Sequence, residues 1–195
     1  MPLSRPTKRK LLHMRDITLR GYVREDGCVD IEARMTDVKS YSFGNRDRGV
    51  IAAGEPLHDM WIRMTVTPDL LITDCEASLD SGPYNICGDV TPNMQRLVGL
   101  RIGKGFLSAA MQRVRGPEGC THLRELLQPV ATVAMQTMIG AGKTGSTAEL
   151  DEQEGHFDAR FTNTCYSYAE DGPVVTRAKE MAANLSPEMP VTGLK

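Results

Sequence analysis

The sequence predicts an α+β fold in which an antiparallel sheet of about four strands is followed by a helical C-terminal half. Three observations support this prediction. Segments in the first 80 residues alternate between apolar and polar positions, which is the period of a half-buried strand. Short turn sequences join these segments into pairs. Beyond residue 90 the apolar residues recur every three or four positions, which is typical of amphipathic helices.

The first predicted hairpin joins residues 13–24 to residues 29–36. Its turn is Glu25-Asp26-Gly27, where the glycine permits a positive φ. The second strand alternates cleanly, with apolar side chains on one face and charged or hydroxyl side chains on the other. We therefore expect this pair to be antiparallel and half-buried.

The second predicted hairpin joins residues 60–66 to residues 70–79 through the turn Thr67-Pro68-Asp69. Between the two hairpins, residues 39–59 show no periodicity and contain three glycines and one proline. A loop of about 20 residues within a compact domain is more often functional than incidental. We expect a long loop there and four strands arranged as two hairpins in one sheet.

Helices are predicted in the second half of the chain. Thr91 as N-cap and Pro92 at the first helical position indicate a helix running to about residue 100. Residues 105–115 form a second candidate. A third starts at Thr121 with strong helical spacing, and Pro129 within it predicts a kink or a division into two helices.

The two ends of the chain differ from the predicted domain between them. Residues 1–12 are basic, contain two prolines and lack the apolar run of a secretory signal, so we expect an extended or disordered segment. Residues 13–195 are predicted to form a single α+β domain with a flexible Gly/Ser/Thr-rich loop near 140–155. No apolar run is long enough to cross a bilayer, so no membrane partner is expected.

Composition narrows the classes of function. A net charge of −2 gives no bulk electrostatic case for nucleic-acid binding. The five cysteines form an odd set without a CxxC pair, which favours a cytoplasmic protein with reduced thiols and no zinc ribbon. Gly142-Lys143-Thr144 lacks the first glycine of a P-loop, since Thr137 stands at that position. We therefore expect neither cofactor nor metal, and a Met-rich core that favours homo-oligomers.

The segment between the long loop and the third strand contains a candidate catalytic histidine. His58 can act as general base or acid near neutral pH, and Glu55 three residues earlier is the expected orienting partner. The alternative is a turn whose polar side chains bind their own backbone. Lys39 and Tyr41, where the second strand enters the loop, are candidates for stabilising an oxyanion.

Further candidates for substrate binding lie on the strands and before the third helix. Cross-strand ion pairs on a solvated face explain Arg20, Tyr22 and Arg24 at once, and the functional alternative is that they line a floor for an anionic or phenolic ligand. Trp61 is a candidate for contact with an aromatic ligand. His122 follows Cys120 at a predicted helix start and serves as a reserve candidate, the alternative being a packed thiol and a solvated imidazole.

Five spaced blocks of the sequence resemble an uncharacterised bacterial domain family, a domain of unknown function. The resemblance covers most of residues 12–140 and fades afterwards. One branch of that family is linked to lyases that release formaldehyde from lignin-derived aromatic dimers, and the resemblance assigns no catalytic residues. The blocks are residues 19–32, 37–46, Gly54-Glu-Pro-Leu-His-Asp-Met60, Val98-Gly-Leu-Arg-Ile-Gly103 and Gly119-Cys-Thr-His-Leu123.

These observations lead to two hypotheses of function. The first is a cofactor-independent lyase that acts on a small lignin-derived aromatic compound of the phenylcoumaran type and releases formaldehyde by general acid/base chemistry. His58, oriented by Glu55, would then transfer protons while Lys39 and Tyr41 stabilise the oxyanion. The second is a non-catalytic module for small-molecule binding or homo-oligomeric assembly, to which the Met-rich surfaces point.

Overall fold

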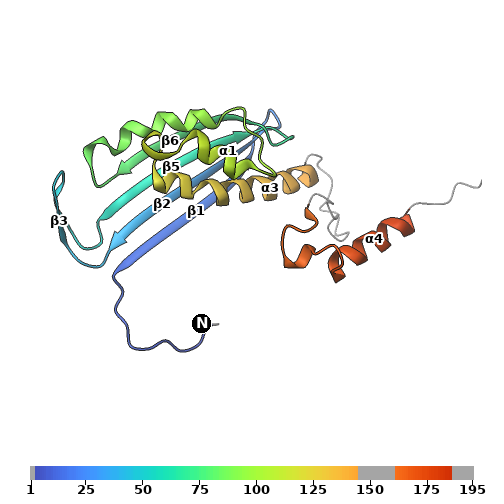
Figure 1. Cartoon of the computed structure of the whole chain (residues 1–195), viewed down its shortest axis with the longest axis horizontal. Helices are drawn as coiled ribbons and strands as arrows, with labels where there is room; N and C mark the ends of the chain where they lie inside the picture. The colour runs from blue at the N-terminus through green and yellow to red at the C-terminus, as the bar shows by residue number, and fades with distance from the viewer. Residues whose placement is uncertain (1–2, 145–160, 186–195) are drawn as a thin grey trace, which may run out of the picture. The chain divides into compact units, whose positions relative to one another are not determined.

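The computed structural model describes residues 3–144 and 161–185. The chain forms two compact units, residues 1–147 and 148–195, of which the first contains the sheet. The predicted α+β class is confirmed, because a four-stranded antiparallel sheet precedes the helices (Figure 1). Residues 140–144 of the flexible loop predicted near residues 140–155 are helical, and the rest of that loop lies outside the described residues.

The main sheet consists of two long hairpins. β1 (His13–Val23) pairs with β2 (Val29–Lys39), and β5 (Pro56–Val66) pairs with β6 (Ile72–Ser81). β2 and β5 also pair antiparallel, which gives the strand order β1-β2-β5-β6. Four strands in two hairpins were predicted, and the structure confirms them.

The region predicted as a long loop between the hairpins contains regular structure. β3 (Phe43–Asn45) and β4 (Gly49–Ile51) form a short two-stranded sheet, and β5 already begins at Pro56. The Asn45 side-chain oxygen accepts hydrogen bonds from the backbone amides of Asp47 and Arg48, which holds the turn between β3 and β4. Three-residue strands are too short to produce a readable alternation, so the prediction of an aperiodic loop was wrong.

The first predicted helix is also different in the structure. A 3₁₀ segment, η1 (Asn85–Leu97), starts six residues before Thr91 and contains Pro92. The Thr91 hydroxyl donates to the carbonyl of Gly88 within this segment, so Thr91 does not cap a helix. Because 3₁₀ turns bond three residues back and lack the 3.6-residue period, the sequence pattern did not reveal them.

The remaining helices of the first unit follow the predictions more closely. α1 (Phe106–Arg113) lies within the predicted segment 105–115, and the short η2 (Gly116–Glu118) follows it. The helix predicted from Thr121 is divided into α2 (Thr121–Glu125) and α3 (Leu127–Thr144). Pro129 therefore stands in the first turn of α3, where its missing N–H breaks no intrahelical hydrogen bond.

The core lies between one face of the sheet and the helices (Figure 1). Methionines from β2 and β5 contribute much of it, and leucines from α2 and α3 close it. α3 comes so close to Gly21 of β1 that a Cβ atom added at Gly21 would lie 1.9 Å from the Thr137 hydroxyl oxygen. Large and fully buried side chains include Met35, Met60, Met64, Met94, Leu97, Leu123, Leu126 and Leu127.

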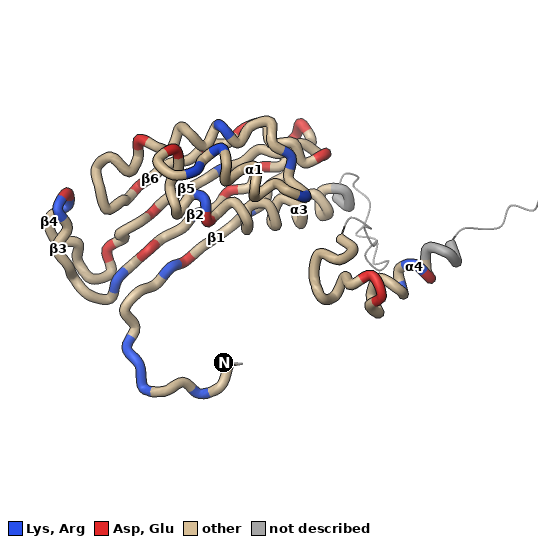
Figure 2. Tube along the Cα trace, in the orientation of Figure 1, with Lys and Arg blue, Asp and Glu red and all other residues tan. Residues whose placement is uncertain are grey.

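Two further parts of the chain complete the description. Residues 3–12 form neither helix nor strand and are exposed, and they include the Lys and Arg positions coloured blue before β1 in Figure 2. The second unit contains η4 (Tyr166–Tyr168) and α4 (Pro173–Leu185). None of the helices within the described ranges combines the length and the apolar character that crossing a bilayer would require.

Candidate functional site

A carboxylate is buried near the end of β2. Asp37 is 1% exposed and follows Val29, Ile31, Ala33 and Met35 on the face of the strand that packs against the helices. The register between β2 and β5 shifts between Asp37 and Val38. A buried carboxylate loses its hydration, which costs several kcal/mol unless charged and hydrogen-bonding partners surround it.

Arg15 of β1 is the principal partner of this carboxylate. The two residues are cross-strand neighbours, and the guanidinium binds both oxygens, with Nε 2.8 Å from Oδ1 and Nη2 2.7 Å from Oδ2. Its Nη1 atom lies 2.5 Å from the Glu125 carboxylate of α2. Burial raises the pKa of Asp37, but the hydrogen bonds and charge of Arg15 outweigh burial and lower it to about 2. Asp37 is therefore ionised at neutral pH.

Three of the chain's four histidines surround the same carboxylate. His58 of β5 places Nδ1 2.9 Å from Oδ2, and His13 of β1 places Nε2 3.1 Å from Oδ1. His122 of α2 places Nε2 3.8 Å from Oδ2. The ring centroids of His58 and His122 are 3.9 Å apart. We call Asp37, Arg15, His13, His58 and His122 the Asp37 cluster.

The environment keeps two of these imidazoles neutral. Burial, followed by the neighbouring His122, lowers the pKa of His58 below its ordinary value. Burial and then the charge of Arg15 lower the pKa of His122. Because ionised Asp37 can only accept, neutral His58 donates from Nδ1 and carries its lone pair on Nε2. Nε2 of His58 has no hydrogen-bond partner among the described residues. Every buried side-chain nitrogen or oxygen atom in the described part of the chain does have such a partner, so Nε2 is not buried and reaches the surface.

The cluster also has the composition of a possible metal site. Ligand atoms of Asp37, His58 and His122 all lie within 4.8 Å of one another. However, the Arg15 guanidinium occupies both oxygens of Asp37, and a divalent cation would have to bind beside this fixed positive charge. The residues present therefore fit a proton-transfer site better than a metal centre.

A small hollow shares one residue, His13, with the Asp37 cluster. Its volume is about 120 Å³, and its lining is mainly apolar. His13 lines this hollow and also contacts Asp37, whereas the lining residues Met14 and Val38 stand in the opposite strand phase from Arg15 and Asp37. A cavity of about 150 Å³ can hold benzene, so this space is close to the size of one aromatic ring. The lining residues are Leu11, His13, Met14, Val38, Lys39, Ser40 and Gly54.

Four of the predicted site residues lie in this region, although not all as expected. His58 and His122 come together at Asp37, and Lys39 lines the hollow. Tyr41 is 42% exposed, and its ring centroid lies 5.6 Å from the Lys39 Nζ atom.

The expected partnership of Glu55 with His58 is wrong. The Glu55 carboxylate binds Arg48 and accepts a hydrogen bond from the backbone amide of Ala52. It therefore stabilises the turn before β5, and the carboxylate at His58 belongs to Asp37 instead.

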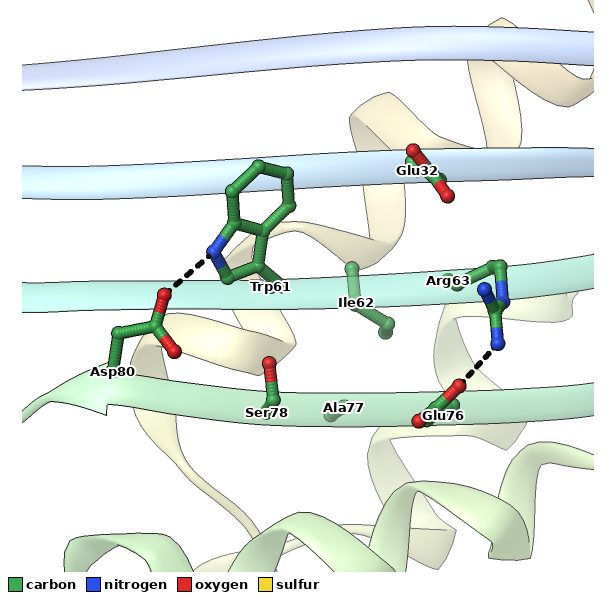
Figure 3. A pocket seen from close by; sticks show the side chains of 8 residues that line it. All are labelled: Glu32, Trp61, Ile62, Arg63, Glu76, Ala77, Ser78 and Asp80. Atoms are coloured by element: carbon green, nitrogen blue, oxygen red, sulfur yellow. Dashed lines mark hydrogen bonds and ion pairs between the residues drawn. The ribbon is translucent and has the colours of Figure 1, made fainter.

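The other predicted binding residues lie away from the cluster, because successive side chains of a strand point to opposite faces. Arg20 and Tyr22 follow the opposite phase of β1 from Arg15. Arg24 forms ion pairs with Asp26 of the β1–β2 turn and with Asp30 of β2. Trp61 lines a separate hollow of about 380 Å³ on the sheet face turned away from the helices (Figure 3). Arg34 stacks on Trp61 at 4.9 Å, and Asp80 accepts from its indole N–H.

The central residues of the cluster, Asp37 and Arg15, were missed by sequence reasoning, as was His13. A signal for them exists. Asp37 continues the apolar phase of β2 after Met35, so it marks a charged side chain that points into the core. Such a residue needs a cationic partner, and Arg15 stands opposite it once the hairpin is in register.

Comparison with known families gives one match. A family model described as "Protein of unknown function (DUF2889)" matches residues 13–136, which include β1 to β6 and the whole Asp37 cluster. No curated protein and no solved structure gives a significant match. Because the family model covers more than half of the chain, the protein belongs to the DUF2889 family.

Proposed function

We propose that this protein is a cofactor-independent lyase that releases formaldehyde from a small lignin-derived aromatic compound by general acid/base chemistry. The substrate class follows from the resemblance of the five residue blocks to the domain family. The reaction type is supported by one observation above the others, which is the hydrogen bond between buried Asp37 and His58. It directs the unprotonated Nε2 of His58 toward a ligand at the surface of the cluster.

His58 is the general base of the proposed reaction. Its pKa is lowered by burial and by His122, so the neutral form is already populated at neutral pH. When Nε2 takes a proton, the imidazolium forms beside the Asp37 carboxylate, which stabilises the new charge. Arg15 keeps Asp37 ionised and fixed in position. Asp37 and Arg15 are thus positioning residues in this proposal.

The hollow beside His13 is the proposed binding position for one aromatic ring of the substrate. Its volume of about 120 Å³ suits one ring and is too small for a dimer, so the second ring would lie outside it. Lys39 at the rim would stabilise a phenolate oxygen, and Tyr41 beside it would donate a further hydrogen bond.

The proposed chemistry has two steps in a phenylcoumaran-type side chain. First, the benzylic carbon–oxygen bond of the fused ring breaks, and its electron pair stays on the phenolate oxygen near Lys39. His58 then removes the proton of the terminal hydroxyl group. The adjacent carbon–carbon bond breaks, formaldehyde leaves, and the released electron pair forms the carbon–carbon double bond of the product.

The test is an aldehyde-trapping assay with a panel of phenylcoumaran-type dimers and the purified full chain. We expect His58→Ala to lower kcat/KM by roughly 10²–10⁴-fold, the usual contribution of general acid–base catalysis. Trp61→Phe on the opposite sheet face is the matched control and should keep nearly full activity. Turnover of His58→Ala within twofold of the unmodified protein would exclude His58 as the base.

A binding or assembly module is the second candidate function. β1 is an edge strand, and it exposes Met14, Ile17, Tyr22 and Val23, which favours self-association. This exposed edge is the reason for including a homo-oligomeric state in the proposal. A cytoplasmic location is included because all five cysteines are free. Absence of aldehyde from every dimer, together with saturable ligand binding, would favour this second candidate.

A further inference from the structure

We propose that Cys120 and His122 form a thiol–imidazole pair, oriented by Asp37, that adds covalently to small aldehydes at the edge of the Asp37 cluster. The aldehyde class rests on the proposed function, because formaldehyde would be released within this cluster. The nucleophilic thiol itself is argued from the geometry of the three residues and is tested separately.

The imidazole of His122 lies between the thiol and the carboxylate. Its Nδ1 atom is 3.9 Å from the Cys120 sulfur, and its Nε2 atom is 3.8 Å from Oδ2 of Asp37. This is the order of groups in a nucleophile–base–orienter arrangement, and such contacts are commonly longer before a ligand binds. With the proton of neutral His122 on Nε2 toward Asp37, the lone pair on Nδ1 faces the thiol.

The four other cysteines lack this arrangement. Cys75 is buried in the core, and burial raises its pKa to about 12. Cys28 lies beside Asp26, and burial together with that carboxylate raises its pKa. Cys87 packs against Gly82, and Cys165 is exposed. Cys120 is half-buried, so it is the thiol that combines access with a contact to an imidazole among the described residues.

The covalent step needs no oxidant or reductant. The Cys120 thiol proton moves to Nδ1 of His122, and the sulfur attacks the carbonyl carbon. A carbon–sulfur bond forms, and the π-electron pair of the carbonyl moves to its oxygen. That oxygen then takes the proton back from His122, which leaves a hemithioacetal and restores the neutral imidazole. The reaction is reversible, so the aldehyde is held and not consumed.

The first test measures thiol reactivity without any dimer substrate. The full chain is treated with iodoacetamide at neutral pH, and alkylation of each cysteine is followed by peptide mass spectrometry. We expect Cys120 to react faster than the more exposed Cys165, and His122→Gln to slow Cys120 by about tenfold or more while Cys165 is unchanged. Equal rates at the two cysteines, or no effect of His122→Gln, would overturn the proposal.

The second test uses ¹³C-labelled formaldehyde as the probe. We expect a hemithioacetal carbon signal in the unmodified protein that is lost in Cys120→Ser and retained in Cys165→Ser. Persistence of the signal in Cys120→Ser would overturn aldehyde capture at this thiol. Neither test depends on turnover of a dimer. If Cys120 is reactive but the protein releases no aldehyde, the lyase proposal is refuted and the reactive thiol stands.

Discussion

The Nδ1 atom of His58 lies 2.9 Å from the Oδ2 atom of Asp37, its cross-strand neighbour on the helix-covered face of the sheet. The two residues are 21 positions apart, and the pairing of β2 with β5 brings them together. The same carboxylate binds Arg15 from the other side. One buried charge thus connects three strands and orients the proposed base.

Asp37→Asn should destabilise the protein strongly. The substitution leaves Arg15 without its anionic partner, and removal of one member of a buried ion pair costs about 3–5 kcal/mol. Since Arg15 is 27% exposed, we expect a loss of roughly 2–4 kcal/mol in the free energy of unfolding, measured by urea denaturation. Asp59→Asn, which removes the partner of the more exposed Arg34, is the control and should cost less. Equal losses would contradict a special role for Asp37.

Stability should fall in two steps as the pH is lowered. The pKa values of His58 and His122 are lowered by folding, so the unfolded chain binds more protons below about pH 6.5 and stability decreases there. The pKa of Asp37 falls from 3.8 to about 2, so its contribution is complete above pH 3.8 and is lost on further acidification. This second step should amount to roughly 2 kcal/mol.

Urea titrations between pH 7.5 and pH 2.5 measure both steps. His58→Gln should flatten the first step and leave the second, whereas Asp37→Asn should remove the second. A stability that is independent of pH between 7 and 4 would show that the histidines are not held in their neutral form.

The pH–rate profile of the proposed lyase should report the base. We expect kcat/KM to rise with pH and to level off with an apparent pKa below 6.5, because the pKa of His58 is lowered by burial and by His122. Replacement of His122 by Gln removes the effect of the neighbouring imidazole on His58 and should shift this apparent pKa upward. A midpoint above 7 in the unmodified protein would be incompatible with His58 as the base.

Gly21→Ala tests the close approach of β1 to α3. The added Cβ would lie 1.9 Å from the Thr137 hydroxyl oxygen and 2.9 Å from its Cβ, so strand or helix must shift. Overpacking of this kind costs about 1–3 kcal/mol, and the melting temperature should fall accordingly. Gly44→Ala, where a Cβ meets nothing within 4 Å, is the control. Addition of Thr137→Ala should restore part of the loss, and no recovery would place the strain elsewhere.

The structure shows where sequence patterns are informative in this chain. The alternation in residues 29–36 predicted β2 and its buried face correctly, because one face of that strand packs against helices and the other does not. The 3₁₀ segment η1 and the short β3–β4 hairpin were missed, since neither is long enough or regular enough to impose a period.

The candidate site divides in the same way. His58, His122 and Lys39 were identified because their side chains carry suitable chemistry and stand at the ends of predicted elements. Glu55 was predicted to be the partner of His58 because it is only three residues away in sequence. That prediction was wrong, because the Glu55 carboxylate binds Arg48 instead. Arg20, Tyr22 and Trp61 were assigned to the site without knowing which sheet face the helices cover.

The sequence by itself determined the fold class, the two hairpins and the buried face of β2, because these depend on local turns and on the alternation of apolar residues. Only the tertiary structure decided which carboxylate serves His58 and which arginine neutralises it. Those contacts join Arg15, Asp37 and His58 from three strands and His122 from a helix, and they depend on register and packing over long separations in sequence. Desolvation of Asp37, which makes these partners necessary, exists only once the helices cover the sheet.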